Sequence, residues 1–336
     1  MTGPGSRPKV GVIGYDQKFI RPILEYLARN GHSIDAYEWD KYNVDDTDRT
    51  RTVIEDTDVI VAEWLGRNAV EAVTHRASDQ PVIVRMHRFE LYRNEWADLD
   101  IDSVGMVITV GEEYRRRLLA RTGWPPEKVM VIPNAVDVEA LDLPKQNKAE
   151  FTIGLLGVAS ERKRLDLALD VFERVLERDD RYRLQIKSAH PQSLKWVWDS
   201  PTERAFATRV DERLQAPPFR DFVSWIEPGP DVTGWLQGIG YLLSTSDDES
   251  FHLSPAEGAA SGAVPIVRDW PGASEIHPDG FVASIDELPD LILDMAGDRD
   301  RAGKRAQAFV RTHYDIEVVG EQWTSLIDRL ASIAGS

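Results

Sequence analysis

Short, almost wholly apolar runs alternate with longer amphipathic stretches along this chain, and this alternation restricts the fold more than any other feature. A strand that is apolar on both faces is typical of a parallel sheet that helices cover on both sides. In the first part of the chain we predict six such strands, at residues 9–14, 33–37, 58–62, 81–85, 104–110 and 129–132. The helical spacing of apolar residues predicts helices over 19–30 and 112–122.

The pattern starts again after a polar, proline-bearing stretch at residues 136–149, which we interpret as a linker. The second part is expected to hold strands at 151–156, 182–187, 222–226, 239–244 and 264–267, and helices at 165–178, 255–261, 286–295, 298–312 and 317–331. Residues 191–220, with several prolines and aromatic residues, receive no assignment.

Two α/β halves of this kind predict two Rossmann-like domains that face one another across a cleft. We place the first domain at residues 1–140 and the second at 150–312. The amphipathic segment within 313–336 is expected to form a helix that returns to the first domain, because its apolar positions need a surface to bury against.

Composition excludes several classes of protein. Among 336 residues, 40 are Lys or Arg and 57 are Asp or Glu, and the net charge of −17 argues against a nucleic-acid partner. The chain has no cysteine, which excludes disulfides, thiolate metal sites and cysteine nucleophiles. It has no apolar run of about 18 residues and no signal-peptide pattern, so we expect a cytoplasmic protein. Weak peripheral contact with a membrane surface stays open.

The segment ESFHLSPAEG, residues 249–258, follows an expected strand and opens an expected helix. A helix N-terminus offers free N–H groups to a phosphate. Glu249 lies in the loop and Glu257 in the expected first turn, so the two carboxylates can flank one phosphate-bearing ligand and reach its sugar and its ribose. The alternative is that the acidic residues 247–249 only cap a helix. We interpret Asp247 and Asp248 as a solvated loop pair and not as a metal site.

Three consecutive cations, Arg162, Lys163 and Arg164, occupy another expected strand-to-helix turn. Arginine binds phosphate oxygens as a fork and lysine as a point charge, so the cluster predicts a diphosphate site. The alternative is a solvated helix start. Cations are unfavourable at that end of a helix dipole, which favours the ligand-binding interpretation.

Taken together, these segments resemble the retaining family 4 glycosyltransferases of the GT-B architecture. The resemblance extends over most of the chain from about residue 104 onward. It lies in residues 131–137 (VIPNAVD), 163–169 (KRLDLAL), the Glu249 and Glu257 pair, 258–265 (GAASGAVP), 270–276 (WPGASEI) and the tail 313–323.

The resemblance implies that the chain transfers a sugar, as a hexosyltransferase does, from a nucleotide-diphosphate-sugar donor with retained configuration. The acceptor would be a glycan, a lipid-linked molecule or a small molecule. Glu257 would hold the donor ribose, Glu249 would lie by the sugar and the reacting centre, and Lys163 would contact the diphosphate. The phosphate cradle would be completed by Ser250, Phe251, His252 and Leu253. No cofactor and no metal ion are implied, since cations and the helix end already neutralise the leaving group.

Two positions depart from the family pattern. Val158 stands where the family has an arginine after the glycine of the turn, and Arg162 is expected to replace that phosphate contact. The first loop, residues 14–16, lacks the usual pair of glycines.

Three further features each have a functional and a plain interpretation. His87, just after the fourth strand, is expected to face the sugar as a second catalytic residue, or else simply packs or lies at the surface. Trp225 is expected to stack on the nucleobase, or else packs in the core. The basic helix over 112–121 contacts anionic lipids or is a solvated helix with i,i+4 ion pairs, and we favour the second.

Other functions remain compatible with the same scaffold, because a fold does not fix a function. The alternatives are a nucleotide-sugar epimerase, a phosphorylase, and a sugar-nucleotide-binding protein without catalysis. The presence of both glutamates and of Lys163 argues against the last. The donor's base and sugar, the acceptor and the oligomeric state stay open at this stage.

Overall fold

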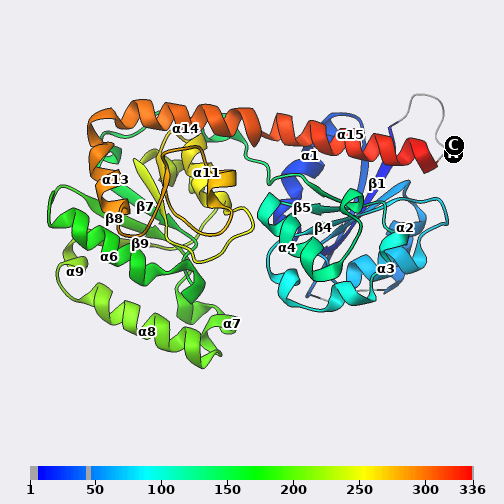
Figure 1. Cartoon of the computed structure of the whole chain (residues 1–336), viewed down its shortest axis with the longest axis horizontal. Helices are drawn as coiled ribbons and strands as arrows, with labels where there is room; N and C mark the ends of the chain where they lie inside the picture. Colours follow the sequence, from blue (N-terminus) through cyan, green and yellow to red (C-terminus); the bar gives the residue numbers. More distant parts are fainter. Residues whose placement is uncertain (1–6, 43–46, 335–336) are drawn as a thin grey trace. The chain divides into compact units, whose positions relative to one another are not determined.

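The computed structural model describes residues 7–42 and 47–334. Its contacts divide the chain into two compact units, each with a sheet of its own (Figure 1). The first unit comprises Met1–Ala135 and Tyr314–Ser336, and the second comprises Val136–His313.

The first unit is built on a six-stranded sheet in the order β2-β1-β3-β4-β5-β6, and every neighbouring pair is parallel. Because β1 lies between β2 and β3, the winding reverses between β1 and β3, where the carboxyl ends of parallel strands leave room for a ligand. The strands are β1 (Lys9–Tyr15), β2 (Ser33–Trp39), β3 (Val59–Glu63), β4 (Val82–Met86), β5 (Met106–Thr109) and β6 (Val129–Val131).

Helices cover both faces of this sheet, and the sequence predicted some of them but not others. The expected helices are found as α1 (Arg21–Arg29) and α4 (Glu112–Thr122). We did not predict α2 (Thr47–Glu55) and α3 (Arg67–His75). Both have only nine residues, and α3 begins at Gly66 without a side-chain cap, so the usual start signal is missing.

The last helix of the chain, α15 (Ile316–Ala334), belongs to the first unit and lies beside α1 (Figure 1). Its buried Val319, Trp323 and Ile327 share one apolar core with Ile23 and Leu27 of α1. The helices approach so closely at Gly320 that an added Cβ would lie 2.3 Å from a ring carbon of Tyr26. The first core is therefore made from both ends of the chain.

The second unit repeats the plan with six parallel strands in the order β12-β11-β10-β7-β8-β9. The strands are β7 (Thr152–Leu156), β8 (Arg183–Lys187), β9 (Val223–Ile226), β10 (Tyr241–Ser244), β11 (Val264–Arg268) and β12 (Val282–Ala283). Two wholly parallel sheets with covering helices confirm the expected α/β class and its two Rossmann-like folds.

The helices of the second unit include three in the segment that received no assignment. Ser200 caps α8 by accepting the N–H of Glu203, and Pro201 takes the first helical position, so a capping-box signal was present in the sequence. The helices are α5 (Val138–Leu141), α6 (Leu165–Leu176), α7 (Lys195–Trp198), α8 (Pro201–Gln215), α9 (Phe219–Phe222), α10 (Val232–Gln237), α11 (Leu253–Ala260), α12 (Ala273–Ile276), α13 (Leu288–Asp294) and α14 (Arg299–His313).

The stretch that we interpreted as a linker, 136–149, is partly structured. It contains α5, and Lys145 within it donates hydrogen bonds of 2.8 Å to the carbonyl of Leu236 and of 2.9 Å to Ser261 Oγ. The linker interpretation is therefore wrong for this segment, because these contacts fasten it to the second unit.

Within residues 7–42 and 47–334, no helix is both long and apolar enough to cross a bilayer.

Candidate active site

A loop and a turn of the second unit meet at the carboxyl ends of two neighbouring strands. The turn after β7 carries the three cations, and the loop after β10 leads to α11. Because β7 pairs with β10, the two segments are hydrogen-bonded to each other. The N–H of Asp247 donates to the carbonyl of Arg162 (3.0 Å), and Thr245 Oγ1 donates to the carbonyl of Lys163 (3.1 Å). The backbone thus fixes where the cations stand.

Glu249 is the centre of this arrangement. One oxygen of its carboxylate, Oε1, lies 2.7 Å from Lys163 Nζ and 2.7 Å from Arg162 Nη1. Burial opposes ionisation, but the two cations outweigh it and hold the pKa of the Glu249 carboxyl well below its usual range. The site therefore presents an ionised carboxylate between two cations.

Arg164 faces other partners. Its guanidinium is bound to Asp166 at 2.9 Å and to Asp247 at 3.1 Å, and Asp247 also pairs with Arg268. Our interpretation of Asp247 as a solvated loop residue is therefore wrong, because it joins two arginines at the strand ends. Only the first two cations of the turn reach Glu249.

His252 forms the start of α11 and is locked in place. Its backbone is left-handed (φ 60°), and its ring lies between Ser244 Oγ (2.8 Å from Nδ1) and Ser254 Oγ (2.9 Å from Nε2). Burial and the neighbouring Lys163 hold the pKa of His252 well below its ordinary value, so the ring is neutral. No side chain caps α11, so the ring serves the structure while the N–H groups at Leu253 and beyond remain at the helix start.

Glu257 is the fifth residue of α11, since the helix begins at Leu253 and not at Pro255 as expected, and it lies beyond the first turn. Burial raises the pKa of Glu257 to about 7. Among the described residues none donates a hydrogen bond to this carboxylate, whose pKa shift has burial as its sole cause. A buried carboxylate in this state is a receptive acceptor for hydroxyl groups.

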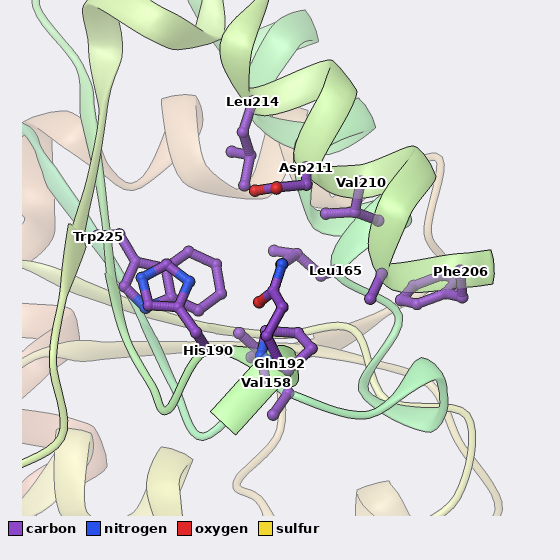
Figure 2. Close-up of a pocket in the computed structure, with 12 residues that line it drawn as sticks. Val158, Leu165, His190, Gln192, Phe206, Val210, Asp211, Leu214 and Trp225 are labelled. Carbon is purple, nitrogen blue, oxygen red and sulfur yellow. The ribbon is translucent and has the colours of Figure 1, made fainter. Parts of the chain in front are cut away.

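Trp225 forms one side of an apolar pocket with walls from α8 and the start of α6 (Figure 2). Its Nε1 donates to the carbonyl of Ser188 (2.8 Å), and the ring of His190 stacks on it at 4.5 Å with an angle of 16°. That ring therefore covers one face of the indole, which the sequence did not reveal. Val158 lines the same pocket and donates its N–H to Ser188 Oγ (3.1 Å).

His87 belongs to the first unit, whereas the other predicted site residues belong to the second. It is 5% exposed, and its Nε2 lies 2.9 Å from Glu63 Oε1. The plain alternative of a surface histidine is therefore excluded. Sequence analysis missed Glu63, Arg85 and Glu90, which are all fully buried near His87. Two of them interrupt otherwise apolar strand runs, VIVAE and VIVRM, and that signal was readable.

Comparison with solved structures identifies the architecture. HepE of Anabaena in complex with UDP has a TM-score of 0.75 and 13% identity, over 96% of this chain and 100% of HepE. Sucrose-phosphate synthase of Thermosynechococcus elongatus has a TM-score of 0.73 and 13% identity, over 97% and 100%. This chain has the GT-B fold. The resemblance to GT-B glycosyltransferases drawn from the sequence is thereby confirmed at the level of fold.

Sequence comparison adds one distant relative of this GT-B chain. It is 25% identical over 203 residues to one of the subunits of the phosphatidylinositol N-acetylglucosaminyltransferase of Arabidopsis thaliana. The aligned region is 60% of this chain and 42% of the plant protein, so the chain spans less than half of that relative's length. No model of a known protein family matches.

The basic helix of this GT-B chain, α4, pairs its cations within the helix. Arg115 lies 3.2 Å from Glu112, and Arg116 and Arg117 each lie 2.7 Å from Glu113. This is the arrangement expected of a solvated helix with local ion pairs.

Proposed function

We propose that this protein is a retaining family 4 glycosyltransferase that moves a sugar from a nucleotide-diphosphate-sugar donor to a glycan, lipid-linked or small-molecule acceptor. In this proposal the second unit binds the donor and the first binds the acceptor. The observation that carries it is the group formed by Lys163, Arg162 and Glu249 at the start of the helix that bears Glu257.

The diphosphate binds to the cations of the turn and to the N–H groups at the start of α11. Phosphate oxygens share Lys163 and Arg162 with Glu249, and Arg162 supplies the contact that Val158 does not make. As the bond to the sugar breaks, negative charge grows on the leaving phosphate, and these fixed donors stabilise it. The proposal needs neither a metal ion nor a cofactor, because these groups already supply the charge.

The sugar and the ribose bind to carboxylates. Glu257 accepts hydrogen bonds from the ribose diol, which offsets the desolvation that raises its pKa. Glu249 lies by the sugar as an ionised group, where it opposes the positive charge of an oxocarbenium-like transition state. His87 orients a sugar hydroxyl.

The solved relatives support the choice of donor class. The HepE structures hold UDP, UDP with glucose, and UDP-glucose. A uridine diphosphate sugar is therefore the first donor to test.

The experiment is incubation with a panel of nucleotide sugars, with and without glycan and lipid-linked acceptors. Transfer, or slow hydrolysis of one donor, supports the proposal, and NMR of the new glycosidic bond reads its anomeric configuration. Interconversion of the donor sugar would support an epimerase instead. Phosphate-dependent cleavage of a glycan would support a phosphorylase, and binding without turnover a non-catalytic protein.

A further inference from the structure

A buried polar network joins the carboxyl ends of three strands in the first unit. Glu63 at the end of β3 and Arg85 in β4 are both 0% exposed, and Arg85 Nη1 donates to Glu63 Oε1 at 3.0 Å. Arg85 Nη2 donates to Asn134 Oδ1 at 2.6 Å. Buried charges are costly unless each is paired, and replacing such a pair with apolar residues often stabilises a protein. The network therefore asks for a purpose besides stability.

The imidazole of His87 lies against this network in one fixed orientation. The Glu63 oxygen that binds Arg85 also lies 2.9 Å from His87 Nε2. The ring packs between Phe19 and Trp64, with centroids at 5.1 Å and 4.3 Å. Trp64 has a left-handed backbone (φ 75°), which is unusual for a bulky residue and is found most often at functional sites.

The charges of the pair decide where the histidine proton lies. Burial holds the pKa of His87 below its ordinary value despite Glu63, so the ring is neutral and has one N–H. Burial opposes ionisation of Glu63, but Arg85 and His87 outweigh it and keep the pKa of that carboxyl low. A carboxylate only accepts hydrogen bonds, so the single N–H stands on Nε2. Among the described residues, no hydrogen-bond partner lies at Nδ1.

We propose that Glu63 is a positioning residue that fixes His87 as the Nε2–H tautomer, so that Nδ1 accepts a hydrogen bond from a hydroxyl of the sugar substrate. The hydroxyl contact rests on the proposed function, whereas the tautomer does not. Arg85 and Asn134 in turn hold the Glu63 carboxylate in place. No proton is transferred in this role.

The test is NMR of the full chain labelled with ¹⁵N-histidine, since a protonated and a bare imidazole nitrogen have different chemical shifts. The variant His87→Gln identifies the His87 signals by their loss. Near neutral pH we expect a protonated Nε2 and a bare Nδ1. A protonated Nδ1, or an imidazolium, in the unmodified protein would overturn the proposal, and this measurement needs no variant of Glu63 that folds.

The variants then separate Glu63 from its surroundings. Glu63→Gln is expected to give a mixture of tautomers, because an amide can donate as well as accept. Glu90→Gln is the matched control, since Glu90 is an equally buried carboxylate that binds the backbone N–H of His87 (3.0 Å) and not its ring. It should leave the tautomer unchanged. An unchanged tautomer in Glu63→Gln, or an equal change in both, assigns the network to structure alone.

The hydroxyl contact has its own readout. UDP-glucose should move the Nδ1 signal of His87, and UDP, which lacks the sugar, should not. Saturation with UDP-glucose that leaves Nδ1 unmoved would overturn the contact. A chain that transfers no sugar from any donor would overturn the proposed function, and the tautomer of the free protein would still decide the role of Glu63.

Discussion

The ammonium group of Lys163 lies 2.7 Å from the carboxylate of Glu249, although the two residues are 86 positions apart in the sequence. The parallel pairing of β7 with β10 brings them together. The cation is thus already positioned, and already shared, at the place where the proposed diphosphate binds.

Lys163→Ala should weaken the binding of UDP by at least about tenfold, and that of uridine much less. The lost partner is a phosphate oxygen, and a hydrogen bond to a charged group contributes roughly 1.5–3 kcal/mol. Arg162→Ala should act in the same direction. Isothermal titration with both ligands measures the effect.

The matched control for that experiment is Arg164→Ala. Arg164 belongs to the same turn but is bound by Asp166 and Asp247. It should change the ratio of UDP to uridine affinity little. Equal losses for the two ligands in Lys163→Ala would show that the turn is a solvated surface.

Glu257→Gln should reduce the affinity for uridine by roughly 1.5–3 kcal/mol, because the ribose diol loses a charged acceptor. Burial raises the pKa of Glu257 to about 7, and only the ionised form is the proposed acceptor. The affinity of the unmodified protein should therefore rise as pH rises through about 7, and the variant should lose this dependence. Uridine is the better probe here because it has no phosphate to titrate. Parallel pH profiles would remove Glu257 from the site.

Glu90→Gln should flatten the dependence of stability on pH. Burial raises the pKa of Glu90 to about 7 in the folded state, against about 4.3 for a free glutamate. Its stabilising contribution is fully present below the lower value and is lost as pH rises through the higher one. The glutamine keeps an acceptor for the N–H groups of Leu65 and His87. Urea unfolding between about pH 5 and 8 compares the two proteins, and curves of equal slope would contradict the prediction.

Glu249→Ala and His87→Ala should each lower turnover by at least about tenfold, which is about 1.4 kcal/mol of transition-state stabilisation. Donor binding should survive better than in Glu257→Gln. In Glu249→Ala it should even hold or tighten, since Lys163 and Arg162 lose a competing partner. Steady-state kinetics with direct donor titration tests both. Full turnover in His87→Ala would confine the site to the second unit.

The sequence predicted those parts of the fold that local chemistry specifies. The apolar runs gave the strands of both sheets within a few residues, and Glu112–Thr122 was predicted with both helix ends correct. Helix α8 was missed although Ser200, Pro201 and Glu203 form a start signal, because the surrounding prolines and aromatic residues obscured it.

The site was harder to predict, because its contacts depend on strand order and not on local pattern. The turn and the loop were both identified, but only the pairing of β7 with β10 shows that Lys163 and Glu249 touch. The ring of His190 on Trp225 could not be foreseen, since it follows the end of β8, a strand that the sequence does not pair with β9. Glu63 and Arg85 carried a signal, charge inside an apolar strand, that we did not use.

The packing of α15 on α1 has a consequence for the order in which this chain folds during synthesis. Domains generally fold from the N-terminus as the ribosome makes them. Here the first unit lacks Val319, Trp323 and Ile327 of its core until all of Val136–His313 has been made. The nascent first unit must therefore wait with an apolar face uncovered while the second unit, which is continuous in sequence, folds ahead of it. A nascent chain stalled before α15 would be prone to aggregate, although every residue of the proposed donor site would already be in place.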